Sequence, residues 1–318
     1  MFSIKQLDAD VILALADMAE IVPVVEEAFA DFSAGKTIMP EKMYLELPQF
    51  NGDFRAMPCY SERHQLAGIK WVNVHPDNVR KNLPSVMAMM FVNDPETGKP
   101  KAILDATTIT FLRTGAAGGV ATKYFARKDV NQIGFVGAGV QAFHQFSAHN
   151  VVLSNLESVH IYDPSTLAAQ AFEQFVKQFF SGEIIVHPNL EACVRSSEVI
   201  TTTTPVRSPI IKSEWVQNGT HINAIGADAP GKQELETALL TRASVFVDDI
   251  EQASHSGEIN VPISEGVFSR EMVRAGIGDV ILGKKIGRRS DDEITIFDST
   301  GLAVQDLALA GYLLQKSA

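Results

Sequence analysis

The residues with the clearest chemical potential surround a glycine turn, Gly137-Ala138-Gly139, which follows the apolar run Gln132–Val136. Ala142 completes the pattern G-x-G-x-x-A. In this pattern the first glycine permits a tight turn, the second lets the backbone approach a pyrophosphate, and the small third residue packs the next helix against the strand. The amino terminus of that helix then faces the phosphates. The pattern therefore predicts a dinucleotide site that opens at residues 137–142.

An acidic residue follows at the interval that such a site requires. Asp163 comes directly after the apolar run Ser158–Tyr162 and 21 residues after Ala142 (163 − 142 = 21), where a carboxylate meets a ribose 2′-hydroxyl. Glycine turns without a ligand also join strands to helices, so this acid favours the cofactor interpretation. A carboxylate there repels a 2′-phosphate, and residues 164–166 contain no Arg or Lys. We therefore expect NAD rather than NADP.

Other polar residues lie in four segments among apolar or glycine-rich sequence. The most suggestive is Asp228, because it follows the apolar run His221–Ile225 and ligands of open α/β sheets bind beyond the carboxyl ends of strands. The alternative is that Asp228 only caps a turn before Pro230 and Gly231. The four segments are residues 53–58, 68–73, 112–115 and 226–232.

Lys70 lies in a strand-like segment between Ile69 and Trp71. A lysine with apolar neighbours is either a surface residue that snorkels or a desolvated amine with a lowered pKa. From spacing alone, we expect the commoner surface position for Lys70, and likewise for Arg55 and Lys42.

The order of predicted helices and strands, which must position these groups, changes near residue 106. Apolar residues at helical spacing in Ala9–Phe32, interrupted at Pro23, predict two short helices. Strand patterns then predict a mixed domain that contains an antiparallel sheet. The strands are expected at residues 43–47, 68–74, 85–92 and 102–105.

A helix over Thr108–Phe125 leads into strands that alternate with helices of crossover length, which is typical of a Rossmann-type, doubly wound parallel sheet. A final helix over Leu302–Gln315 is expected to return to the first domain. The expected fold class is thus α/β, with a mixed α+β substrate and dimerisation domain (1–112 with 302–318) and an NAD-binding domain (113–301). The parallel strands are expected at residues 132–136, 158–162, 183–187, 198–202, 221–225, 244–248 and 294–297.

The composition excludes several classes of partner. The chain has 318 residues, of which 46% are hydrophobic and 20% charged, which suits two domains with separate cores. A net charge of −11 opposes binding to nucleic acid. The start of the chain resembles no secretory signal, and about 18 consecutive apolar residues occur nowhere, so a cytoplasmic protein without a membrane span is expected. Cys59 and Cys193 form no Cys-x-x-Cys pair; both are expected to be buried thiols, and no metal site is expected.

Several long segments resemble the ornithine cyclodeaminase/mu-crystallin family, above all its archaeal-type alanine dehydrogenase branch, over nearly the whole chain. The resemblance implies a homodimer in which the N-terminal domain and C-terminal helix form the interface and cover the substrate. The segments that carry it are residues 39–42, 54–58, 68–73 with 75–76, 112–117, 222–235 and 297–301.

The same resemblance assigns roles to individual residues. Lys70 and Asp228 are implied to be catalytic, and Lys42 and Arg55 to bind the substrate carboxylate. Besides Gly137 and Gly139, the residues implied to line the cofactor are Ser85, Arg113, Val140, Gln141, Asp163, Thr204, Asn223, Ala224, Ile225, Lys232 and Ser299.

One departure from the family pattern bears on the substrate. Arg55 precedes Ala56-Met57-Pro58, where ornithine cyclodeaminases carry a glutamate near the distal amine of their substrate. An arginine there would repel an ammonium, so we expect L-alanine, converted reversibly to pyruvate and ammonium by hydride transfer to NAD. The alternatives are a ketimine or pyrroline-2-carboxylate reductase, an ornithine cyclodeaminase, and a non-catalytic, mu-crystallin-like NAD-binding protein.

Overall fold

The computed structural model describes residues 4–317, which divide into two compact units. One unit takes the described residues up to Arg113 and those from Leu302 onward, and the other is Thr114–Gly301. Residues 1–3 and 318, which the sequence assigns to the first domain, lie outside the described residues.

The first unit is built on a mainly antiparallel sheet, as expected. Its strand order is β1-β7-β6-β5-β4-β2, β3 pairs with β4, and only the pairing of β1 with β7 is parallel among the described strands. The strands are β1 (Lys5–Leu7), β2 (Thr37–Ile38), β3 (Met43–Leu47), β4 (Gly52–Ser61), β5 (Leu66–Val74), β6 (Val86–Asn93) and β7 (Pro100–Asp105).

The sequence analysis did not predict β4, the strand that carries Arg55. Pro58 argues against a central strand because it cannot donate a backbone hydrogen bond. In the structure β3 pairs with β4 only up to Ala56, and β2 pairs only from Tyr60 onward. Pro58 falls in the interval between these partners, so the missing N–H costs no hydrogen bond on that edge.

Helices α1 (Ala9–Leu15) and α2 (Met18–Ser33) replace the predicted pair that Pro23 was to separate. That prediction was wrong about the position of the break. Asp17 accepts a hydrogen bond from the backbone N–H of Ala19 and so starts α2 before the proline. The buried stripe of α2 continues from Ile21 to Phe29 across Pro23, and this packing outweighs the local cost of the proline.

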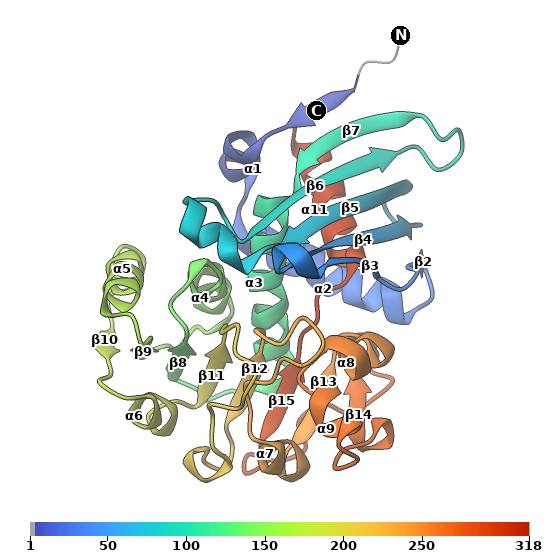
Figure 1. Cartoon of the computed structure of the whole chain (residues 1–318). Helices are drawn as coiled ribbons and strands as arrows, with labels where there is room; N and C mark the ends of the chain where they lie inside the picture. Colours follow the sequence, from blue (N-terminus) through green and yellow to red (C-terminus); the bar gives the residue numbers. More distant parts are fainter. Residues whose placement is uncertain (1–3, 318) are drawn as a thin grey trace. The chain divides into compact units, whose positions relative to one another are not determined.

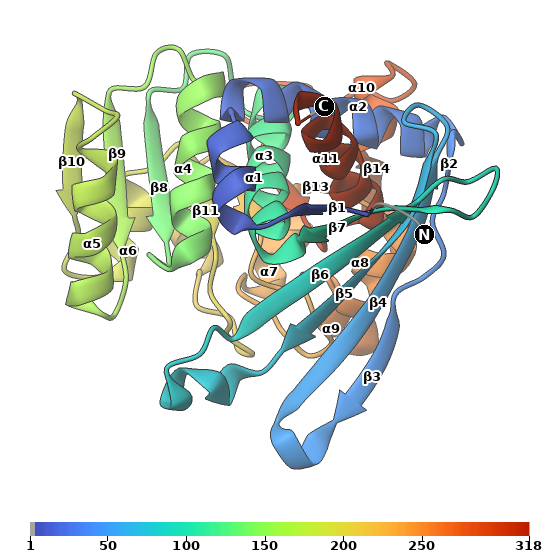
Figure 2. The same ribbon diagram turned by 90° about the horizontal axis from the view of Figure 1, so that it is seen from above.

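The two faces of this sheet have different environments. Helix α11 (Ala303–Lys316) packs on β4, β5 and α2 (Figures 1 and 2). Side chains alternate along strands, so one set of β4–β6 residues faces the helices and includes Lys70, whereas the other set includes exposed apolar residues of β5 and β6. That exposed set contains Ile69, Trp71, Met87, Met89 and Phe91.

The second unit contains the expected doubly wound parallel sheet. Its strand order is β10-β9-β8-β11-β12-β15-β13-β14, and every pairing is parallel among the described residues. The sequence analysis missed β14. The strands are β8 (Gln132–Val136), β9 (Ser158–Tyr162), β10 (Glu183–Val186), β11 (Val199–Thr202), β12 (His221–Ala224), β13 (Ser244–Val247), β14 (Val273–Gly276) and β15 (Thr295–Asp298).

Helices cover both faces of this sheet (Figure 2). One core joins α4 and α5 to β8 and β9 through Phe135, Phe146 and Phe172, and the other joins α6 and α7 to strands that include β11, β12, β13 and β15. The strand order reverses between β8 and β11, which is where open α/β sheets bind ligands. The helices not yet given are α3 (Ala106–Phe125), α4 (Val140–Val152), α5 (Thr166–Val176), α6 (Leu190–Arg195), α7 (Thr237–Arg242), α8 (Ile250–Ser256), α9 (Asn260–Ser264) and α10 (Ile277–Ile281), with 3-10 turns η1 (Pro48–Phe50), η2 (Pro76–Lys81), η3 (Ser213–Trp215) and η4 (Arg270–Met272).

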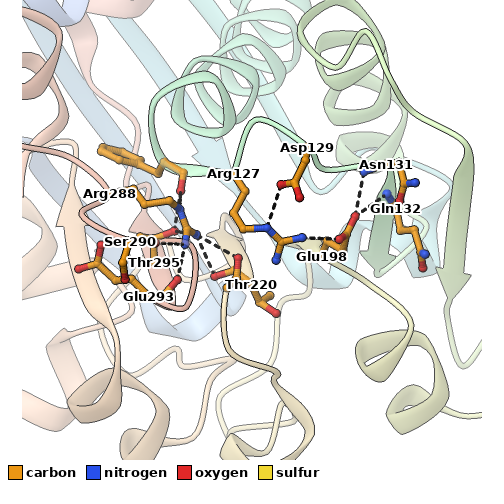
Figure 3. A network of polar contacts seen from close by, with 12 residues as sticks. Arg127, Asp129, Asn131, Gln132, Glu198, Thr220, Arg288, Ser290, Glu293 and Thr295 are labelled. Atoms are coloured by element: carbon orange, nitrogen blue, oxygen red, sulfur yellow. Dashed lines mark hydrogen bonds and ion pairs between the residues drawn. The ribbon is translucent and has the colours of Figure 1, made fainter.

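A polar network ties together the amino ends of these strands (Figure 3). Arg288 donates to the backbone oxygens of Phe125, Gly219 and Ser290 and to the hydroxyl of Thr295. Glu198, paired with Arg127, accepts the backbone N–H groups of residues 131 and 132. The network lies at the edge opposite the glycine turn, so its role is structural.

Two buried histidines continue this network into the unit. Within α4, His149 Nδ1 lies 2.7 Å from the carbonyl oxygen of Gln145, and its Nε2 lies 2.9 Å from the hydroxyl of Thr122. His221 bridges Thr295 and Asn223. Burial lowers the pKa of His149 to about 4 and that of His221 to about 3. The folded state therefore holds both rings neutral.

These values predict an acid-dependent loss of stability. An unfolded histidine has a pKa of about 6.5, so the stabilisation from keeping His149 neutral is complete above pH 6.5 and declines as the pH falls from 6.5 toward 4. We expect His149→Asn to destabilise the protein at pH 7.5, and this deficit to shrink by about 2 kcal/mol at pH 5 because the variant has no ring to protonate. The difference in the free energy of unfolding between the variant and the wild type is measured by urea unfolding at both pH values.

His255 supplies the matched control. Its Nδ1 makes the same contact with the carbonyl four residues earlier, at 2.8 Å, but on an exposed part of α8. Because this contact is exposed, it should contribute little stability, and His255→Asn should have only a small effect at either pH. A deficit of His149→Asn that did not change with pH would contradict the assignment.

Candidate cofactor and catalytic sites

The glycine turn follows β8 at the point where the strand order reverses. Gly137 has a φ of +93°, and a Cβ at this residue would meet Thr203 Oγ1 at 2.9 Å and Thr204 Cγ2 at 3.0 Å. Gly139 is the N-cap of α4 with an ordinary φ of −75°, and a Cβ there would meet nothing within 4 Å. Gly137 is thus required by the fold, whereas Gly139 leaves an open surface over the helix amino terminus.

Asp163 is bound to this turn. One of its carboxylate oxygens accepts the N–H of Ala138 at 2.8 Å and the other accepts the N–H of Ser165 at 2.7 Å. Each carboxylate oxygen has a second lone pair. Asp163 is therefore fixed at the end of β9 and still able to accept hydrogen bonds from vicinal hydroxyls.

Polar atoms near the carboxyl ends of the strands are buried without a hydrogen-bond partner among residues 4–317. They include Oε1 of Gln141, in the first turn of α4, and Oγ of Ser299, directly after β15. Val140, beside Gln141, is 56% exposed. Unpaired buried polar atoms are costly in a folded protein. Together with the open turn, they fit a site for a polar ligand such as a dinucleotide.

Glu234 organises the loops after β11 and β12. Its fully buried carboxylate accepts hydrogen bonds from Thr202 Oγ1 (2.6 Å), from the N–H and hydroxyl of Thr204 (both 2.7 Å) and from the N–H of Gly226 (2.8 Å). Burial raises the pKa of Glu234. One side chain therefore fixes Thr204 and the start of the loop that carries Asp228.

Two further buried carboxyls hold the segment of Glu234 itself. Glu258 accepts the N–H groups of Glu234 (2.9 Å) and Leu235 (2.6 Å), and Asp298 accepts the N–H of Ile259 (3.2 Å). Burial raises the pKa of both Glu258 and Asp298 well above the usual range. The sequence analysis assigned no role to these acids.

The loop after β12 places Asp228 beside Lys232. Their side chains form an ion pair of 2.6 Å, and the Asp228 side chain is 37% exposed. Asn260 supports this loop by accepting the N–H of Gly231 at 2.9 Å and donating to the carbonyl of Lys232 at 3.0 Å.

Asn223, Ala224 and Ile225 are buried at the end of β12. The side chain of Asn223 donates to Thr122 Oγ1 at 2.9 Å and contacts His149 and His221. Its side chain therefore serves the internal network, and any ligand contact of these three residues falls to the backbone. The N–H of Ser299 donates to the carbonyl of Ala224 at 3.1 Å.

In the first unit, Lys70 and Arg55 are buried rather than on the surface, so the expectation from spacing was wrong for both. Lys70 is 1% exposed. Its ammonium pairs with Asp306 at 2.7 Å and donates to Thr110 at 3.2 Å. Burial in this helix-covered face lowers the pKa of Lys70 to about 8, against the opposing effect of Asp306. Of the two alternatives that the sequence left open for Lys70, a snorkelling surface residue and a desolvated amine, the structure therefore shows the desolvated amine.

Arg55 and Arg113 share this helix-facing side with Lys70. Arg55 is 5% exposed, pairs with Asp53 at 2.8 Å and lies 5.4 Å from the ring centre of Tyr44. Arg113 pairs with Asp306 at 3.1 Å. Both guanidinium groups lower the pKa of Lys70. The structure thus brings three predicted site residues into one electrostatic cluster.

Two other predicted residues of this unit are less involved. Lys42 precedes β3 and is partly exposed, and Ser85 precedes β6, where its carbonyl accepts the N–H of His75 at 2.8 Å. Asp306 and Gln305, which both contact Arg113, were missed. Their signal was available, because a helix otherwise rich in Ala and Leu had to bury two adjacent polar side chains.

Neither a metal centre nor a membrane-spanning helix occurs in the part of the chain that the structure describes. In residues 4–317, no group of three or more His, Cys, Asp or Glu side chains could hold a metal ion. No helix in that part of the chain is long and apolar enough to cross a membrane. Cys59 and Cys193 are free and buried, as predicted.

The fold and these sites define a class of protein with a Rossmann-type unit joined to a mixed α+β unit that buries a lysine among arginines. The chain belongs to the ornithine cyclodeaminase/mu-crystallin family, whose model matches residues 6–317.

Individual relatives are similar over nearly their whole length. Alanine dehydrogenase of Archaeoglobus fulgidus is 50% identical over 305 residues, which cover 96% of this chain and 92% of that protein. The structure of an archaeal alanine dehydrogenase dimer with bound NAD matches with a TM-score of 0.94 and 49% identity, covering 99% and 96% of the two chains. Delta(1)-pyrroline-2-carboxylate reductase of Thermococcus litoralis, in complex with NADH and L-proline, matches with a TM-score of 0.95 and 36% identity, covering 99% and 97%.

Proposed function

We propose that this protein is an NAD-dependent amino-acid dehydrogenase that converts L-alanine, NAD and water to pyruvate, NADH, ammonium and a proton, reversibly. The observation that carries the proposal is the desolvated amine of Lys70 in a cluster with Arg55 and Arg113. Similarity to the alanine dehydrogenase of Archaeoglobus fulgidus supports the choice of substrate.

The unit Thr114–Gly301 binds NAD in this proposal. The N–H groups at the start of α4 receive the pyrophosphate over Gly139, and Asp163 accepts hydrogen bonds from the ribose hydroxyls. When bound, the cofactor supplies the hydride acceptor or donor. The carboxylate of Asp163 disfavours a 2′-phosphate, so NADH should bind more tightly than NADPH in paired titrations; the reverse order would refute this assignment.

The first unit binds the substrate. On the helix-covered side of its sheet, Arg55 and Lys70 from the strands and Arg113 from α3 lie close together, and Arg55 pairs with Asp53 whereas Lys70 and Arg113 pair with Asp306. Three basic side chains gathered in this way suit a substrate that has a carboxylate. Arg55 and Lys42 hold that carboxylate in the proposal, and a fixed orientation supplies much of the rate in such transfers.

Lys70 and Asp228 handle the protons. A lysine with a pKa of about 8 is present in both protonation states near neutral pH, so it either donates a proton to the carbonyl oxygen or accepts one from the attacking water. Asp228 accepts a proton from the substrate ammonium group before hydride transfer and then stabilises the positive charge of the iminium intermediate.

The test is a steady-state comparison of substrates with NADH. Pyruvate plus ammonium should give the highest kcat/KM, and L-alanine with NAD should give the reverse reaction. A kcat/KM for pyrroline-2-carboxylate roughly tenfold or more above that for pyruvate would instead identify the second candidate, a pyrroline-2-carboxylate reductase, which the match to the Thermococcus litoralis structure favours. If the protein bound NADH but converted no 2-oxo or imino acid, it would instead be a non-catalytic NAD-binding protein.

The exposed apolar face of the first sheet supports the proposal of a homodimer. Trp71, Met89 and Phe91 lie on it with 38%, 44% and 44% of their surfaces exposed, and Trp71 is directly opposite Met89. Met43 lies in the same cross-strand row, separated from Trp71 by Ala56, and is 70% exposed. A continuous apolar face of this kind is typical of an interface.

We expect Met89→Asp to convert the dimer to a monomer, because a buried, unpaired carboxylate would oppose association by several kcal/mol. Sedimentation velocity at micromolar protein measures the change. Met272→Asp is the control, since Met272 is also 44% exposed but lies in the second unit. A wild-type protein that sedimented as a monomer, or a Met89→Asp variant that remained dimeric, would contradict the proposed interface.

A further inference from the structure

A buried ion triad holds the amine of Lys70. Asp306 on α11 pairs with Lys70 at 2.7 Å through one carboxylate oxygen and with Arg113 at 3.1 Å through the other. The side chains of Lys70, Asp306 and Arg113 are 1%, 0% and 7% exposed. With water excluded, the geometry of the carboxylate determines where the two cations lie.

The triad also joins segments that are distant in sequence. Lys70 comes from β5, and Arg113 is the last residue before the chain leaves the first unit. Asp306 and Gln305 follow soon after the chain returns to it at Leu302, and Gln305 accepts a hydrogen bond from Arg113 at 3.2 Å. In addition, Gln305 accepts the N–H of Leu302 at 2.8 Å, which fixes the first turn of α11 and therefore the position of Asp306.

We propose that Asp306 is a positioning residue for the reaction: its carboxylate holds the Lys70 amine in place and sets the pH range in which that amine exchanges a proton with the substrate. The inference rests on the proposed function, because it acts through Lys70.

The charges around Lys70 support this role. Besides Asp306 on α11 and Arg113 on α3, the packed elements bring Arg55, paired with Asp53, and Cys59 from β4, whereas β6 brings the apolar Met90 opposite Lys70. Burial raises the pKa of the Cys59 thiol to about 12, so it is neutral. Burial and both arginines lower the pKa of Lys70, and the carboxylate of Asp306 opposes them by favouring the ammonium form.

The first test is the pH profile of kcat/KM for pyruvate plus ammonium in the wild type and in Asp306→Asn. The wild-type profile should have a limb near pH 8. Loss of the carboxylate should move that limb to lower pH by about one unit or more, whichever of its two proton-transfer roles Lys70 has. A limb that stayed within about 0.3 units in a folded variant would overturn the proposal.

Asp31→Asn is the matched control. Asp31 is also a buried aspartate in a helix of the same unit, paired with Arg63, but it does not contact Lys70. This substitution should cost stability and leave the limb in place. If Asp306→Asn does not fold, Asp306→Glu keeps the charge and displaces it, so kcat should fall; an unchanged kcat in a folded Asp306→Glu protein would contradict the proposal.

A second measurement needs no substrate and therefore separates this proposal from the proposed function. With a lower pKa of Lys70, the folded Asp306→Asn protein binds fewer protons than the wild type below pH 8. Its unfolding equilibrium constant relative to the wild type should be constant above about pH 8.5 and rise up to about tenfold per pH unit below pH 8. For Asp31→Asn the ratio should stay constant between pH 7 and 9. A constant ratio for Asp306→Asn would refute the proposal even if the enzyme acts on another substrate.

Discussion

Lys70→Met is expected to lower kcat for pyruvate and ammonium roughly 10³-fold, because a positioned proton donor or acceptor contributes between about 10² and 10⁴ in rate. Methionine fills most of the volume of the lysine stem without its charge. Asp306 keeps its ion pair with Arg113 in this variant, so the carboxylate is not left unpaired in the interior. The fold should therefore persist.

The binding of NADH separates a catalytic role of Lys70 from a structural one. In this variant the Kd for NADH, measured by fluorescence titration, should stay within about threefold of the wild type, a change of less than about 0.7 kcal/mol. Lys101→Met is the control: Lys101 is an ion-paired lysine on β7 of the same sheet, 3.0 Å from Asp94, but 41% exposed. It should keep full activity. If Lys70→Met retained more than about a tenth of the wild-type kcat, Lys70 would not be the proton-transfer group.

Gly139→Val is expected to weaken NADH binding by about 100-fold or more, equivalent to about 2.7 kcal/mol. The reason is specific to this glycine. Its φ of −75° is accessible to any residue, and a Cβ there meets no protein atom within 4 Å, so we expect the fold to tolerate a valine that obstructs the proposed pyrophosphate position. The free energy of unfolding should change by less than about 1 kcal/mol.

Gly276→Val is the matched control for this substitution. Gly276 is also the N-cap of a helix, α10, with an extended backbone (φ −72°, ψ 143°), and a Cβ there would meet only the carbonyl of Val247 at 4.0 Å. NADH affinity should not change in that variant. Tight NADH binding by a folded Gly139→Val protein would place the cofactor elsewhere and would remove the basis of the proposed function.

The sequence determined most of the second unit, because its signals are local. Strand, glycine turn and helix follow one another within residues 132–152, and hydrophobic periodicity together with glycine spacing predicts such a unit without knowledge of its neighbours. The structure has the predicted strand at Gln132–Val136 and places Asp163 on the turn at Ala138. Where predictions failed, as at Pro23 and Pro58, long-range packing or the register of strand pairing outweighed a local preference.

Only the tertiary structure decided the environment of the proposed chemical groups. Lys70 and Arg55 are surface residues by local statistics, and they are buried because α11, about 240 residues later in the chain, covers their face of the sheet. The position of Asp306 in an apolar helix indicated only that it is buried, and Glu234 carried no local signal; the role of each carboxylate depends on the groups that it contacts in the folded chain. The pKa of Lys70 depends on burial and on three charges from three separate elements, and no pattern in a single segment encodes such a sum.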